Sequence, residues 1–564
     1  MSEQKGKFLQ KNSEDSLGFL AIFLVGLFIR FFGAVKINFT EFEAAYVLGI
    51  EEFVSFSPSI LQNLANKIIF QPPSYIPLAY RLLSIFAGSI IILLPYYLRK
   101  KIGNHSALVC AFFFAIDPFL IADSILITGN TFVLLAVGLF MVAWIEEKYE
   151  LVPLLLVCLT MLGRGFAYFF IAFNIFLLIT SSYPAFLAGL RSGVSNLESN
   201  LGNRNKLLTL GLIFIIIFLI SSTRLEIFVA DLSAFFANLN SNYLTGNSPF
   251  LYPLALSVYI PLGLVFAVLS LFFGPLSSRR VVRLATAVCG ISLFLIMVFP
   301  GHRVVDLVWV SAPLWVVSAI GITHFFDWIK QKLNKSLVFI TLLFISMGNL
   351  ILSIFSLSYR YRFGLGLVNT LAAIFTIVVF IITLVIYWAY IRDIKTALGG
   401  FGIAISIFLL LFQISAASHI SGFSNSPERE IFWDGYYPDK PLIDDLIETS
   451  VGNQLGTMAP VEIWVDKEIR PDIYWELSSN QIKKQIANEE PQKEYLVLFK
   501  SDEGMINYSA PYLGQKFVAN SYPAWMDTPL RSLMGNDFWS WLLFRDSQQH
   551  NAYNYLWINA GSNP

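Results

Sequence analysis

Charged residues are scarce in this sequence. Of its 564 residues, 13% are Asp, Glu, Lys or Arg and 56% are hydrophobic, whereas a soluble globular protein carries roughly 25% charged residues. This shortage excludes an ordinary soluble fold and indicates a chain built for lipid. The formal net charge is zero, so the overall balance gives no reason to expect a nucleic-acid partner.

Cysteine is also rare, and repeats are absent. The three cysteines, Cys110, Cys158 and Cys289, all fall inside apolar runs, so we expect small buried side chains rather than disulfides or metal ligands. No internal repeat or low-complexity tract interrupts the chain. The N-terminal lysines precede a long apolar stretch, but no small-residue cleavage site follows Ala34. This pattern predicts a retained first helix rather than a removed signal peptide.

Long apolar runs dominate what remains and predict thirteen transmembrane helices, from windows of about 20 residues. The fifth and sixth form one run broken at Gly163-Arg164-Gly165. Because a charge in mid-bilayer is costly, we expect two short helices that meet at a polar pocket there. The predicted spans are residues 16–36, 77–98, 105–123, 126–145, 151–163, 166–182, 206–222, 251–273, 283–300, 304–325, 336–356, 367–390 and 398–417.

Lysine and arginine concentrate in alternate loops, as in Arg99-Lys100-Lys101 and around Arg279 and Arg280. The positive-inside rule places those loops and the N-terminus in the cytoplasm. Thirteen crossings then leave the C-terminal segment outside. The sequence therefore predicts an α-helical polytopic protein of the cell membrane, in contact with membrane lipids on all sides.

The composition changes near Ser418, where charges, prolines and turn residues appear. We expect a transmembrane domain at residues 1–417 and a small extracytoplasmic α/β domain at residues 418–564. This outer domain holds seven of the twelve tryptophans, which we interpret as core packing and a membrane-facing aromatic belt rather than sugar stacking. We predict an amphipathic helix at 441–455 and strands at 461–466, 494–500, 538–544 and 553–559.

The first outer loop, residues 37–76, is too long at about forty residues to be a plain connector. It contains Glu41 and Glu43 just after the first span. A carboxylate partly desolvated at that position gains basicity toward a hydroxyl proton. On position alone, the two residues could equally be solvated loop acids.

The order of motifs around this loop resembles the GT-C membrane glycosyltransferases, including protein O-mannosyltransferases and aminoarabinose transferases. The resemblance rests on the first span, on Glu43-Ala44-Ala45-Tyr46, and on Gln71-Pro72-Pro73-Ser74-Tyr75. It continues through the second span and the stretch from Ala107 to Ser124, and covers roughly residues 15–325. These motifs are short, and their order and topology carry the resemblance.

The resemblance implies a polyprenyl-phosphate sugar donor and an acidic catalytic base in the first outer loop. The usual form is Asp-Glu-Ala-x-Tyr. Here Glu43 and Tyr46 match its second half, Phe42 occupies the aspartate position, and Glu41 lies one residue away. Two further departures are Gln71, where the family often has His or Lys, and Asn130, where many relatives have an acid.

Other residues fit supporting roles. A departing lipid phosphate needs fixed positive charge, and Arg164, Arg303 and His302 lie near the predicted outer face. The alternative for each arginine is snorkelling to the headgroups or pairing with an acid such as Asp306. Asp117-Pro118 is expected to end or kink the third span. Asp123 is expected to cap the next helix, and is the carboxylate nearest to Asn130.

Together these features predict an inverting glycosyltransferase that moves a sugar to a hydroxyl of a protein, lipid or glycan acceptor outside the cytoplasm. Glu43 or Glu41 would be the base. The resemblance allows a divalent cation, as in some relatives, but no residue requires one. A non-catalytic component that binds or translocates lipid-linked sugars is the alternative. An unrelated transporter fits less well, because deep charges are few and the sequence has no internal repeat.

Overall fold

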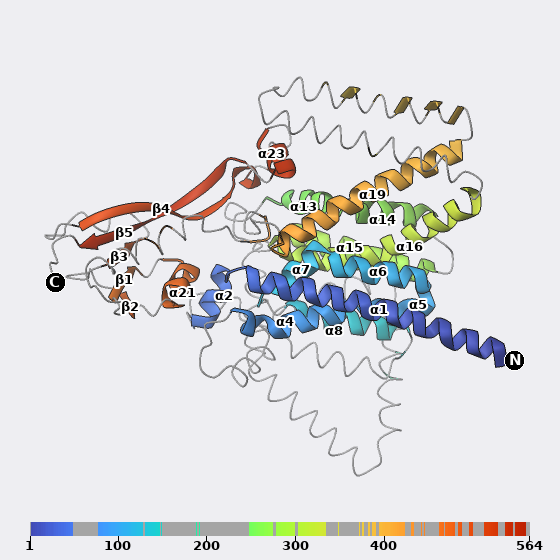
Figure 1. The fold of residues 1–564 in the computed structure, drawn as a ribbon, viewed down its shortest axis with the longest axis horizontal. Coiled ribbons are helices and arrows are strands. Elements are labelled where there is room, and N and C mark those ends of the chain that lie inside the picture. The colour runs from blue at the N-terminus through green and yellow to red at the C-terminus, as the bar shows by residue number, and fades with distance from the viewer. Residues whose placement is uncertain are drawn as a thin grey trace, which may run out of the picture.

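A computed structural model describes residues 2–48, 77–127, 130–146, 248–273, 278–298, 303–333, 394–423, 430–433, 462–466, 469–479, 483–487, 496–499, 512–527, 536–544 and 547–559, with scattered residues elsewhere. The described helices of the first 420 residues gather into one bundle. The C-terminal sheet lies at the end of the molecule opposite the N-terminus (Figure 1).

Within the described ranges, five helices are long and apolar enough to cross a membrane, or seven if two bent pairs each count as one span. They lie in α1 (Ser2–Lys36), α4 (Pro77–Ile91) with α5 (Leu94–Ile102), α15 (Arg279–Val298), η5 (Val304–Leu307) with α16 (Val308–Leu333), and α19 (Ile394–Ile420). This confirms a multi-pass helical membrane protein. Five of the thirteen predicted spans, 151–163, 166–182, 206–222, 336–356 and 367–390, lie wholly or mostly outside the described residues.

The third predicted span is bent at Asp117-Pro118, as expected. Helices α6 (Asn104–Ile116) and α7 (Pro118–Ile125) meet at 54°. Proline has no N–H, so the carbonyl of Phe114 loses its helical donor. Asp117 begins α7 as its N-cap, accepting a hydrogen bond from the backbone N–H of Phe119 at 3.1 Å.

A buried arginine of the first helix satisfies the carbonyls exposed by this bend. Arg30 is fully buried in α1, and its Nη2 donates to the Phe114 carbonyl at 2.9 Å. Its Nη1 donates to the Ala115 carbonyl at 3.3 Å, and its Nε donates to Ser124 Oγ at 3.2 Å. This role of Arg30 was not predicted, although a charge in the middle of an apolar span requires partners.

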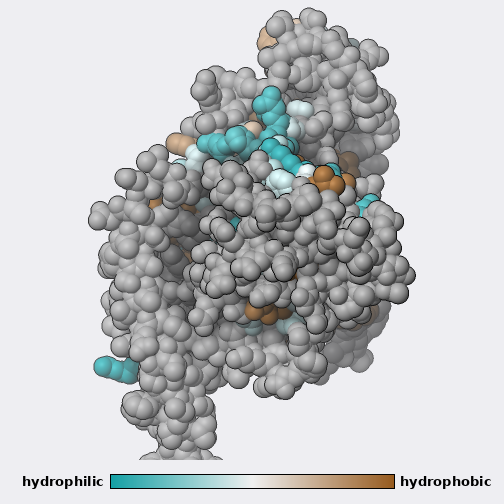
Figure 2. Space-filling model, turned by 90° about the vertical axis from the view of Figure 1, so that its left-hand side faces the viewer, coloured by the Kyte–Doolittle hydropathy of each residue, from teal (hydrophilic) through white to brown (hydrophobic). Residues whose placement is uncertain are grey.

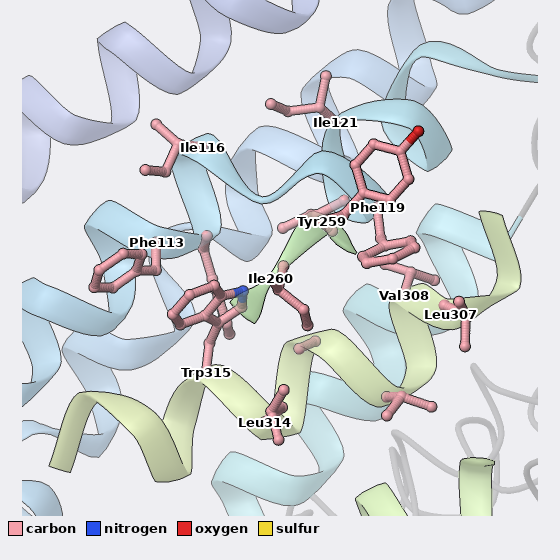
Figure 3. Packing of buried hydrophobic residues seen from close by; sticks show 14 of the residues in the cluster. Phe113, Ile116, Phe119, Ile121, Tyr259, Ile260, Leu307, Val308, Leu314 and Trp315 are labelled. Atoms are coloured by element: carbon pink, nitrogen blue, oxygen red, sulfur yellow. The ribbon is translucent and has the colours of Figure 1, made fainter. Parts of the chain in front are cut away.

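The span predicted at 251–273 is not one straight helix. Helices α13 (Leu251–Tyr259) and α14 (Pro261–Phe273) meet at 94°, because Pro261 has no N–H with which to continue the first helix. Beside this bend, the Ser318 hydroxyl donates to the Gly263 carbonyl at 2.6 Å. Trp315 of α16 stacks on Phe113 of α6 with ring centroids 4.2 Å apart (Figure 3). Aromatic packing therefore joins the helices at the centre of the bundle.

The C-terminal region after α19 contains a five-stranded sheet in the order β2-β1-β3-β5-β4. Strands β1 (Glu462–Asp466), β2 (Lys483–Ala487) and β3 (Leu496–Phe499) are parallel, and helix α21 (Pro471–Ser479) connects the first two. Strands β4 (Tyr512–Pro523) and β5 (Gln549–Asn559) extend the sheet antiparallel. The strands predicted at 461–466, 494–500 and 553–559 are confirmed. Strands β2 and β4 were not predicted, and the helix expected at 441–455 lies mostly outside the described residues.

The strand predicted at 538–544 is wrong, because this segment forms helix α23 (Asn536–Phe544). Its buried aromatics, Phe538 and Trp541, are three residues apart, which is helical spacing, and Trp539 between them is 47% exposed. The buried pair joins the same apolar cluster as the bundle. Trp464, Trp475 and Trp525 are buried as well, so most of the described tryptophans of this region pack in the interior. Among the described residues visible at this end, hydrophilic side chains predominate (Figure 2).

Candidate functional site

The candidate site begins at α2 (Glu41–Leu48), a short helix that follows α1 directly. Thr40 precedes it in a capping box, in which Glu43 N–H donates to Thr40 Oγ1 at 3.4 Å and Thr40 N–H donates to Glu43 Oε2 at 3.0 Å. The Thr40-Glu41-Phe42-Glu43 spacing fits this motif. The cap turns the Glu43 side chain back toward the start of the helix and leaves Glu41 and Phe42 to face other elements.

Glu43 is 4% exposed, and donors surround both of its carboxylate oxygens. Arg81 of α4 donates to Oε1 from Nε at 2.9 Å and to Oε2 from Nη2 at 2.6 Å. The Ile127 backbone N–H donates to Oε1 at 3.1 Å, and the Thr40 hydroxyl donates to Oε2 at 3.1 Å. A bidentate arginine with further donors stabilises an ionised carboxylate and fixes its position.

Arg81 also closes the C-terminal end of α1. Its Nη1 donates to the carbonyls of Ala34 at 3.1 Å and Ile37 at 2.6 Å, and its Nη2 donates to the Asn38 carbonyl at 2.9 Å. The last carbonyls of a helix have no intrahelical donor, so this side chain replaces one. Arg81, which is fully buried, therefore connects its own helix α4 to the end of α1 and to the start of α2.

Glu41 lies in a different environment from Glu43. Its side chain is 22% exposed, and Arg470, the residue before α21, places Nε 3.7 Å from its Oε2. The sequence pattern could not separate the two acids, but their surroundings differ. Glu43 is enclosed by α1, α4 and the backbone of Ile127, whereas Glu41 faces Arg470.

Phe42 stands where the Asp-Glu-Ala-x-Tyr pattern has aspartate, and its ring contacts Arg303. The guanidinium carbon of Arg303 lies 3.5 Å from the centroid of the Phe42 ring, the geometry of a cation–π contact. Arg303 immediately precedes η5, and its backbone N–H donates to Asp306 Oδ2 at 2.9 Å. Asn130, the first residue of α8 (Asn130–Ile145), donates to Asp306 Oδ1 at 2.9 Å. Asp306 thereby links Arg303 and Asn130 beside α2.

The remaining predicted residues divide into three groups. Asp123 is fully buried in α7 and accepts a hydrogen bond from the Thr131 hydroxyl at 2.9 Å, so it contacts the first turn of α8 from the interior. Tyr46 packs against the cluster of Phe39, Ala44, Tyr80, Ile127 and Trp475. Gln71, Arg164 and His302 lie outside the described residues.

Two residues of this site, Arg81 and Arg470, were not predicted from the sequence. Arg81 could have been suspected, since it lies in the first turns of an apolar span and a buried arginine requires an acidic partner. Arg470 carries no such signal, because its contact with Glu41 spans more than four hundred residues of sequence. Nearby, burial raises the pKa of the Tyr474 hydroxyl on α21. Among the described residues, no group of three His, Cys, Asp or Glu side chains is placed to hold a metal ion.

No protein-family model matches this sequence, and no curated protein matches it either. Two solved structures of ArnT from Cupriavidus metallidurans are similar to this chain, each with a TM-score of 0.47. The apo structure is 10% identical, and the match covers 86% of this chain and 94% of that one. The structure bound to undecaprenyl phosphate is 11% identical, with 97% and 98% covered.

Proposed function

We propose that this protein is a GT-C-type membrane glycosyltransferase that moves a sugar from a polyprenyl-phosphate donor to a hydroxyl acceptor on the extracytoplasmic side, with inversion. One observation carries the proposal: adjacent residues of α2 present a partly exposed carboxylate, Glu41, and an aromatic ring that holds an arginine, Arg303. A base and a fixed cation side by side are the two groups that this reaction needs.

In the proposed reaction, Glu41 accepts the proton of the acceptor hydroxyl as the hydroxyl oxygen attacks the anomeric carbon. The bond between that carbon and the phosphate oxygen breaks, and the electron pair leaves with the polyprenyl phosphate. Arg303 stabilises the charge that develops on the phosphate. Its stack on Phe42 fixes the plane of the guanidinium before the donor arrives, so less ordering is needed in the transition state.

The division of labour between the acids is part of the proposal. Glu43 is saturated by donors and positions α2, and Glu41 retains enough exposure to meet an acceptor. Arg164 and His302 are proposed as further phosphate contacts, and Tyr46, Gln71, Asp123 and Asn130 as supporting residues. The resemblance of the sequence supports the donor class. The location of α2 at one end of the helical bundle also supports it, since a polyprenyl tail could stay in the bilayer while its phosphate reaches the site.

The test compares the full-length protein with Glu41→Gln and Glu43→Gln, purified gently from membranes. Native mass spectrometry should detect a co-purifying polyprenyl-phosphate sugar, whose mass identifies the sugar. Glu41→Gln should keep the lipid and lose turnover by on the order of a hundredfold or more, as expected when a general base is removed. Asp527→Asn, a half-exposed outer-domain acid paired with His550, is the matched control. If only bulk phospholipids are found after feeding with polyprenyl-phosphate sugars, the proposed donor is wrong.

A second candidate is a membrane component that binds or translocates lipid-linked sugars without transferring them. The occupation of the Glu43 carboxylate by Arg81, together with Phe42 in the aspartate position, favours it. Here the lipid would be found on the protein, yet the Glu41→Gln variant would retain the wild-type phenotype.

A further inference from the structure

The outer domain packs directly onto the helix that carries the candidate base. Trp475 of α21 contacts Phe39, which precedes α2, with ring centroids 5.0 Å apart. Phe39 also lies beneath the guanidinium of Arg81, 5.2 Å from its carbon. These residues share one apolar cluster with Ala44 and Ile127, and α21 lies beside α2 in Figure 1. The contact therefore links the outer domain to the supports of both acids.

Arg470 stands at the edge of this contact, immediately before α21. Asp472 binds its guanidinium through two hydrogen bonds, from Nε to Oδ1 at 3.0 Å and from Nη2 to Oδ2 at 2.8 Å. The Nε of the same guanidinium lies 3.7 Å from Glu41 Oε2. The three side chains are partly enclosed, with exposed fractions of 15% for Arg470, 22% for Glu41 and 12% for Asp472.

These distances show that Arg470 is shared unequally between the carboxylates of Asp472 and Glu41. A bidentate Arg–carboxylate pair is geometrically rigid, so Asp472 fixes the plane of the guanidinium. Arg470 makes its shorter contacts with Asp472 and therefore interacts more strongly with that carboxylate. Its contact with Glu41 is longer and weaker. One arginine and two carboxylates together carry a net negative charge. Arg470 can therefore orient the Glu41 carboxylate without fully neutralising it.

We propose that Arg470 is a positioning residue of the site: it orients the Glu41 carboxylate and holds α2 against α21, so that the outer domain completes the site at the mouth of the bundle. Its catalytic consequence rests on the proposed function. Its structural consequence, a fixed α2, does not.

The experiment compares the full-length protein with Arg470→Gln, Arg470→Lys and Lys516→Gln. Lys516, on edge strand β4, stacks on Tyr553 within the same domain and is the matched control for loss of one positive charge. Hydrogen exchange of residues 41–48 reports the order of α2. Steady-state turnover with a polyprenyl-phosphate sugar gives kcat, the donor KM and the dependence of kcat on pH. A thermal melt confirms that each variant is folded.

For Arg470→Gln we expect faster exchange in α2 and a fall in kcat of about tenfold to a hundredfold, as for a misplaced catalytic group. The donor KM should stay within about twofold, and the pH profile of kcat should shift, because the charge beside the base is gone. Arg470→Lys, which keeps the charge but not the bidentate geometry, should recover only part of kcat, and Lys516→Gln should resemble the wild type. If Arg470→Gln does not fold, Asp472→Asn, which keeps the arginine but frees its plane, should show the same changes more weakly.

Unchanged exchange and unchanged kcat in Arg470→Gln would overturn the proposal. A rise in donor KM alone would also overturn it, because Arg470 would then bind the donor rather than position the base. If the wild type transfers no sugar from any donor, the proposed function fails, and hydrogen exchange alone still decides whether Arg470 holds α2 in place.

Discussion

Arg81 and Glu43 form a buried ion pair at the point where three helical segments meet, with Nη2 and Oε2 2.6 Å apart and exposed side-chain fractions of 0% and 3%. A charge pair removed from water is tolerated only when its remaining donors and acceptors are satisfied. Here the carbonyls at the end of α1 and the backbone N–H groups of Thr40 and Ile127 meet that requirement.

This pair should be essential for stability even though it need not take part in the reaction. Removing one partner leaves a buried charge unpaired, at a cost of about 3–5 kcal/mol. We expect Glu43→Gln and Arg81→Met each to lower the melting temperature strongly. The double variant should lose less than the sum of the two losses, as measured by a thermal melt in detergent. Glu41→Gln should melt near the wild type, and single variants of the pair that melt normally would contradict this role.

The aromatic ring of Phe42 should tune donor binding through Arg303. Phe42→Leu keeps an apolar side chain but removes the cation–π contact, which contributes about 0.5–2 kcal/mol. We expect a several-fold rise in the donor KM with little change in melting temperature. Phe42→Asp should be worse, because the new carboxylate would pair with Arg303 and compete with the donor phosphate. Steady-state kinetics checks both, and a KM unchanged in Phe42→Leu would exclude Arg303 from the donor site.

The bend at Pro118 and the buried Arg30 should depend on each other. Arg30→Met strands the Phe114 and Ala115 carbonyls, and an unsatisfied buried acceptor costs about 1–3 kcal/mol. Pro118→Ala restores a backbone N–H at position 118, which can donate to the Phe114 carbonyl. We therefore expect Arg30→Met to destabilise the protein and Pro118→Ala to rescue part of the loss in that background. Equal effects of Pro118→Ala with and without Arg30 would show that the two residues are independent.

Alanine substitution of two helical glycines should have different effects on the stability of the protein. A Cβ at Gly88 in α4 would overlap the side chain of Ser124, whereas a Cβ at Gly290 in α15 would meet no atom within 4 Å. Gly88→Ala should therefore lower the melting temperature through overpacking, which costs about 1–3 kcal/mol. Gly290→Ala should be neutral or slightly stabilising, because alanine favours the helix. A tolerated Gly88→Ala would mean that α4 and α7 pack less closely than described.

The sequence predicted the elements whose signal is local. The long apolar runs within the described residues form helices, the Asp117-Pro118 pair forms a bend, and three of the four predicted strands are present. The segment 538–544 was misassigned because an aromatic-rich run satisfies both strand and helix composition, and only the three-residue spacing of Phe538 and Trp541 separates them. Glu41 and Glu43 could have been distinguished, since Thr40-x-x-Glu43 is a capping-box pattern. The pairing of Glu41 with Arg470 could not, because no local pattern encodes a contact between such distant segments.

Carbonyls at the α6–α7 bend accept hydrogen bonds from the buried Arg30. This dependence also constrains how the chain is assembled in the membrane. The Phe114 carbonyl that this arginine requires belongs to a residue 84 positions later in the chain. During synthesis, α1 is complete before its acceptors exist, and inserting it alone would bury a charge that costs roughly 2.5–3.5 kcal/mol on insertion scales. A nascent chain that ends before α6 should therefore hold α1 at the interface. Residues 16–36 and 104–125 would then enter the lipid together, as one step of insertion.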